Sequence, residues 1–79
     1  MNLPTLPPLE QLVNPCPRCW KIGNYYTAAE VQNPETWPQV GDLIVCCACR
    51  ALLVVAAMDD VRPQCRLSTP EERARIGFQ

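Results

Sequence analysis

The chain has 79 residues with six cysteines, nine prolines and no histidine, and its formal net charge is −1. A single domain of this size has a core that is usually marginal unless a metal, disulfides or a partner adds to its stability. The seven basic side chains are scattered along the sequence, so a strong patch for the phosphates of nucleic acid is not expected.

Residues 1–13 form a proline-rich arm with leucine at every third position: Leu3, Leu6, Leu9 and Leu12. A polyproline II helix has three residues per turn, so these leucines would form one apolar edge. We expect the arm to cover its own domain, ending in a helical turn from Pro8 to Val13; the alternative is a strip that docks into a partner. The arm does not resemble a secretory signal, which favours a cytoplasmic protein with reduced thiols.

Residues 20–31 mix aromatic and β-branched side chains with a Gly-Asn pair, which predicts a strand with a turn or bulge. Residues 32–42 are interrupted by proline and glycine and predict a loop. Within this loop, Trp37 is expected to cap the core, because no polar residues accompany it as they would in a ligand site.

Residues 43–45 and 51–58 predict an antiparallel hairpin, and residues 61–67 an irregular segment or a short edge strand. The hairpin is apolar on both faces, so its second face must be covered by the arm, by the C-terminal helix or by another molecule. Its apolar run is too short to cross a membrane. The second face is indirect support for a protein partner, or for a homodimer.

A short C-terminal helix is predicted from its capping residues. Thr69 suits the N-cap, Pro70 the first helical position and Glu72 the third position of a capping box. The helix should run to about Ile76, with Gly77 as its stop. Its arginines are expected to face solvent.

Two C-x-x-C pairs, Cys16/Cys19 and Cys46/Cys49, are separated by 26 residues. Two such loops can place four thiolates around one zinc ion in a closed tetrahedral shell. A closed shell leaves no exchangeable water, so the predicted zinc site is structural and no enzymatic activity is expected. Three disulfides are the alternative, which the adjacent Cys46 and Cys47 make less favourable.

The residue after the second cysteine of such a loop often needs a positive φ, which favours glycine. This chain has Trp20 and Arg50 at these positions, so the loops either adopt another turn or accept strain. Arg50 would offset the thiolate charge and Trp20 would shield the sulfurs. Cys47 and Cys65 are expected to be small buried apolar residues, with a redox switch as the alternative.

The C-P-R-C motif at 16–19, the approach from Gly41 to Cys46 and the apolar strand after it resemble zinc-ribbon proteins with rubredoxin-like zinc knuckles, over residues 14–58. The tail resembles small uncharacterised zinc ribbons of phages and prophages. The resemblance implies a small mainly β domain, a metal-stapled zinc ribbon of two knuckles with an antiparallel sheet. Residues 1–13 would be the arm, 14–67 the ribbon and 68–79 the C-terminal helix and tail.

These features favour a non-enzymatic zinc-binding module for protein interaction, as a phage or prophage accessory protein that modulates host machinery. A nucleic-acid or transcription-associated ribbon is the first alternative, with Arg18, Lys21 and Arg50 contacting phosphate. A rubredoxin-like iron electron carrier is the second, because iron also accepts four thiolates.

Overall fold

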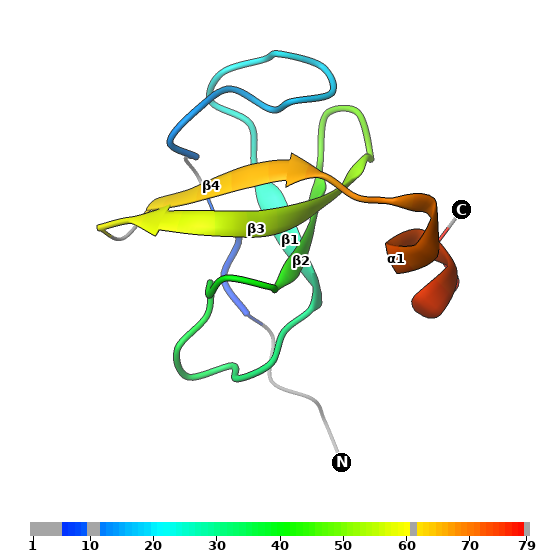
Figure 1. Cartoon of the computed structure of the whole chain (residues 1–79). Helices are drawn as coiled ribbons and strands as arrows, with labels where there is room; N and C mark the ends of the chain where they lie inside the picture. The colour runs from blue at the N-terminus through cyan, green and yellow to red at the C-terminus, as the bar shows by residue number, and fades with distance from the viewer. Residues whose placement is uncertain (1–5, 10–11, 61, 79) are drawn as a thin grey trace.

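The computed structural model describes residues 6–9, 12–60 and 62–78, which contain a four-stranded antiparallel sheet and one short helix (Figure 1). The strands lie in the order β1-β2-β3-β4, so each pairs with the next one along the chain. The elements are β1 (Tyr26–Glu30), β2 (Leu43–Cys46), β3 (Leu52–Asp59), β4 (Arg62–Leu67) and α1 (Pro70–Arg75). The predicted small, mainly β domain is confirmed.

The hairpin predicted from the sequence is β2 and β3, and the segment after it is the edge strand β4. The strand predicted over residues 20–31 is wrong in its first part, because β1 begins only at Tyr26. Gly23 has a φ of +80°, a left-handed conformation that does not continue a strand. Residues 20–25 therefore belong to the loop that precedes β1.

The N-terminal arm crosses one face of the sheet. Leu9 exchanges two backbone hydrogen bonds of 2.9 Å with Tyr26 in β1, and the Val13 amide donates to the carbonyl of Pro63 in β4 at 2.9 Å. Leu12, between these two anchors, is buried. The arm thus covers its own domain as predicted, although the bridge at Leu9 contradicts a helical turn there, and residues 1–5 and 10–11 lie outside the described part.

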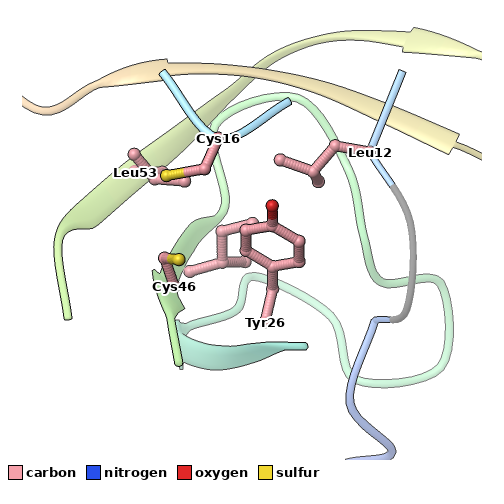
Figure 2. Packing of buried hydrophobic residues seen from close by; sticks show 6 residues of the cluster. Leu12, Cys16, Tyr26, Cys46 and Leu53 are labelled. Atoms are coloured by element: carbon pink, nitrogen blue, oxygen red, sulfur yellow. The ribbon is translucent and has the colours of Figure 1, made fainter. Parts of the chain in front are cut away.

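The two faces of the hairpin bury separate clusters, because side chains alternate along a strand. Ile44 and Leu53 face the arm and the cysteine loops, where Tyr26 joins them; Figure 2 shows Cys16 and Cys46 on one side of the Tyr26 ring and Leu12 on the other. The opposite face carries a second cluster, made of Leu43, Leu52 and Val54 with Val45, Ile76 and Phe78.

Ile76 and Phe78 of the C-terminal segment thus pack on the second face of the hairpin. The sequence left three candidates for this cover: the arm, the helix region or another molecule. The C-terminal residues fill this role, so the apolar character of both faces no longer requires a partner or a homodimer.

The loop of residues 31–42 is organised by one buried carboxylate. Asp42 is fully buried, and it accepts hydrogen bonds from the backbone amides of Gln39, at 2.8 Å, and Gln32, at 3.1 Å. These two bonds draw the ends of the loop together. Trp37 is half-buried against the first cluster, as expected of a residue that caps the core.

Helix α1 begins with the predicted capping box. The Thr69 hydroxyl accepts from the Glu72 amide at 3.2 Å, and the Glu72 carboxylate accepts from the Thr69 amide at 2.8 Å. Glu72 also pairs with Arg66 of β4 at 2.9 Å, which ties the helix to the sheet edge. The arginine and the Thr69 amide lower the pKa of Glu72 to about 2.

The first prediction concerns this cap. Thr69→Ala removes the acceptor for the Glu72 amide, and the free energy of unfolding should fall by ~1 kcal/mol. Thr69→Ser keeps the hydroxyl and should stay close to the wild type. Chemical denaturation of the three proteins measures the difference, and equal stability of the alanine and serine variants would show that the cap contributes nothing.

Candidate metal centre

Two cysteine loops lie at the same end of the sheet (Figure 1). The first loop, residues 16–21, precedes β1, and the second, residues 46–51, joins β2 to β3. Because β1 and β2 are antiparallel, the start of β1 and the end of β2 lie side by side at this end of the sheet, where Tyr26 pairs with Cys46. The sheet topology therefore brings together two C-x-x-C pairs that are distant in the sequence.

The two loops have the same backbone hydrogen bonds. In the first loop the Trp20 amide donates to the Cys16 carbonyl at 2.8 Å, and the Cys16 amide donates to the Lys21 carbonyl at 3.4 Å. In the second loop the Arg50 amide donates to the Cys46 carbonyl at 2.7 Å, and the Cys46 amide donates to the Ala51 carbonyl at 3.0 Å. Each loop is thus a tight turn that places both of its sulfurs on one side.

The position after each second cysteine is left-handed despite the absence of glycine. Trp20 has a φ of 62° and Arg50 a φ of 61°. Of the two possibilities that the sequence left open, the loops accept the strain and keep the turn. A non-glycine residue in this region costs of order 1–3 kcal/mol, which surrounding interactions must offset.

The four sulfur atoms form one cluster. The Sγ atoms of Cys16 and Cys49 are 3.8 Å apart, those of Cys19 and Cys46 are 3.9 Å apart, and all four lie within 4.8 Å of one another. Four sulfurs placed about 2.3 Å from one ion at tetrahedral angles would be about 3.8 Å apart. All six cysteines are free, and the four sulfurs fit a metal ion better than disulfides, which need about 2 Å.

Burial and nearby amides act in opposite directions on the thiols. Burial raises the pKa of Cys16 and raises that of Cys49 to about 12, whereas the Lys21 amide lowers the pKa of Cys19 to about 7. The buried thiols therefore resist ionisation unless a cation compensates their charge. A metal ion would displace their protons, so its affinity should fall with decreasing pH.

Asn24 contributes polar hydrogen atoms to the cluster. Its Nδ2 atom lies 3.5 Å from the sulfurs of both Cys19 and Cys46, one from each loop. The Arg18 amide likewise points at the Cys16 sulfur, at 3.4 Å. Sequence reasoning treated Asn24 only as a turn residue, and the signal that could have shown its role was its place five residues after the last cysteine of the first pair.

We expect Asn24→Ala to weaken metal binding without unfolding the loaded protein. Removal of a hydrogen-bonding partner of a metal ligand typically costs 10-fold to 100-fold in affinity. Competition with a chromophoric chelator measures the change. Asn33→Ala, in the loop at the other end of the sheet, is the matched control, and an unchanged affinity in Asn24→Ala would exclude a role for the amide at the sulfurs.

The two remaining cysteines differ from each other. Cys65 on β4 is half-buried against the first cluster, and burial raises its pKa to about 12. Cys47 is exposed, so the expectation that both are buried apolar residues is wrong for Cys47. It follows Cys46, the last residue of β2, and its side chain lies outside the four-sulfur cluster while its amide donates to Tyr25.

This contrast predicts selective alkylation. Cys47 of the native protein should react with iodoacetamide at least tenfold faster than Cys65, because Cys47 is exposed whereas Cys65 is half-buried and burial raises its pKa. Peptide mass spectrometry over a time course gives both rates. Equal rates in the native protein would contradict the burial of Cys65, and unfolding should remove the difference.

The side chain of Trp20 does not shield the sulfurs, because 69% of it is exposed. Ile22, at 86%, and Tyr25, at 55%, are also exposed, so residues 20–25 carry three large exposed side chains.

In the part of the chain that the structure describes, no helix is long and apolar enough to pass through a bilayer. Comparison with family models, with curated proteins and with solved structures finds no match for the chain.

Proposed function

We propose that Cys16, Cys19, Cys46 and Cys49 bind one structural zinc ion and that the domain is a zinc ribbon with a non-enzymatic role in protein interaction. The four-sulfur cluster carries the proposal, since its spacing suits tetrahedral zinc and all four positions are filled by thiols. Each loop has the same pattern of internal backbone hydrogen bonds, which supports two equivalent zinc knuckles.

Exposed apolar side chains support the interaction role. Trp20, Ile22 and Tyr25 would gain from burial against a partner, and aromatic residues are enriched where proteins bind one another. The rigid zinc loop would hold them in place before binding and so reduce the ordering cost. A phage or prophage origin, with a host protein as partner, rests on the sequence resemblance alone.

Native mass spectrometry of protein purified without added metal tests the zinc site. One zinc ion per chain with six reduced cysteines is the expected result. Iron in place of zinc would give a red protein and favour an electron carrier, whereas a metal-free protein with disulfides would overturn the proposal.

The interaction surface has its own test. Affinity capture should compare the wild type with an Ile22→Ser/Tyr25→Ser double variant and with Val40→Ser. The control removes an apolar side chain as exposed as Tyr25, in the loop at the opposite end of the sheet. A partner retained by the wild type and by Val40→Ser, and lost with the double variant, would support the proposal. Identical captured proteins for all three would contradict it.

A further inference from the structure

Three arginines gather at one hollow beside the second cysteine loop. Arg18 from the first loop, Arg50 from the second and Arg73 from α1 all line a depression of about 400 Å³. This volume is within the range of sites that bind small ligands or single side chains. Arg18, Arg50 and Arg73 are nearly half of the seven basic residues of a chain whose net charge is −1.

The hollow holds these charges without a carboxylate. Its described lining includes no acidic residue, and the ion pairs within the described ranges are Arg66 with Glu72 and Arg75 with Glu30, both outside the hollow. Arg73 is also fixed in position, because its Nη1 donates to the carbonyl oxygen of Ser68 at 2.7 Å and to its hydroxyl at 3.2 Å. One guanidinium is therefore preorganised at the wall.

The rest of the lining is largely apolar. Leu52, Leu67 and Phe78 line it from β3, from β4 and from the C-terminal segment, and Leu67 is 47% exposed. A ligand that contacts both kinds of wall needs an anionic group next to an apolar one. Burial of this apolar group would stabilise the complex by about 25 cal/mol for each Å² of apolar surface removed from water.

The charge balance decides between a carboxylate and a phosphate. Cys49 lines the same hollow, and the proposed zinc ion with four thiolates would carry a double negative charge. The three guanidinium charges exceed this by one. A phosphate monoester carries −1.5 to −2 at neutral pH, which exceeds this single positive charge, whereas one carboxylate matches it.

We infer that this arginine pocket binds an acidic side chain of a protein partner, flanked by apolar residues. The inference rests on the proposed interaction function and names the chemistry of the partner segment. The pocket would supply recognition of the carboxylate, and the exposed side chains of residues 20–25 would supply a separate apolar contact.

The test is an NMR titration of the zinc-loaded full chain with the peptide acetyl-Leu-Asp-Phe-amide. Saturable shifts should centre on the amides of the pocket residues, and acetyl-Leu-Asn-Phe-amide, which lacks the charge, should bind at least several-fold more weakly. Arg50→Gln and Arg73→Gln should each weaken binding roughly threefold to tenfold. Arg62→Gln, an exposed arginine of β4 outside the pocket, should leave the affinity unchanged.

Retained zinc and a native-like spectrum of each variant would show that it is folded. Equal binding of the two peptides, an equal loss in Arg62→Gln, or no shifts at the pocket up to about 10 mM would overturn the inference. Preferential binding of adenosine monophosphate at the same residues would also overturn it, in favour of a nucleotide ligand. Failure here leaves the capture test with Ile22 and Tyr25 variants unaffected, so the two proposals can fail separately.

Discussion

Cys46→Ser should unfold the domain at neutral pH, and so should removal of zinc from the wild type by a chelator. The apparent free energy of structural zinc binding is about 10–16 kcal/mol, which is comparable with the typical 5–15 kcal/mol stability of a whole domain. Cys46 is fully buried and belongs to the first apolar cluster as well as to the four-sulfur cluster. Its substitution would therefore weaken both the proposed zinc binding and the packing of the core. Loss of dispersed amide signals in the NMR spectrum measures unfolding.

Cys47→Ser is the matched control, because Cys47 is adjacent in sequence but exposed and outside the sulfur cluster. It should bind one zinc ion and keep the wild-type thermal midpoint within a few degrees. A chelated wild type that keeps its dispersed spectrum would show that the two apolar clusters suffice without metal. The same result in Cys46→Ser, with zinc retained, would mean that Cys47 replaces Cys46 as a ligand.

The four sulfurs of the candidate site could be predicted because the thiol spacing is local and chemically restrictive. A C-x-x-C turn places two sulfurs together wherever it occurs, so only the meeting of the two turns depended on the fold. The capping box of α1 was predictable for the same reason, since Thr69 and Glu72 act within one helical turn.

The covering of the second sheet face could not be derived from the sequence. Ile76 and Phe78 lie more than 20 residues after Val54 and more than 30 after Val45, and neither stands in a periodic pattern that would distinguish a packed segment from an exposed tail. The sequence therefore left the arm, the C-terminal helix and another molecule as alternatives for a face that the chain covers by itself. The features that favour a partner are instead the exposed side chains of residues 20–25 and the arginine pocket.

Asn24 and the late start of β1 were missed for a related reason. The aromatic and β-branched residues after Cys19 suit a strand, but the tight turn of the first cysteine loop and the left-handed Gly23 keep residues 20–25 irregular. This irregular path turns the Asn24 amide toward the sulfurs of both loops. The local preference for a strand is therefore overridden by the geometry of the first cysteine loop.

The second largest effect is expected from the core of the first face. Leu53→Ala should lower the free energy of unfolding by ~3 kcal/mol, within the usual 2–5 kcal/mol, because Leu53 is fully buried in the first cluster and leaves a cavity. Leu67 lies opposite it on β4 and is 47% exposed, so Leu67→Ala should cost under ~1 kcal/mol. Denaturation in saturating zinc measures both, and equal losses would mean that burial in this sheet does not determine which leucines stabilise it.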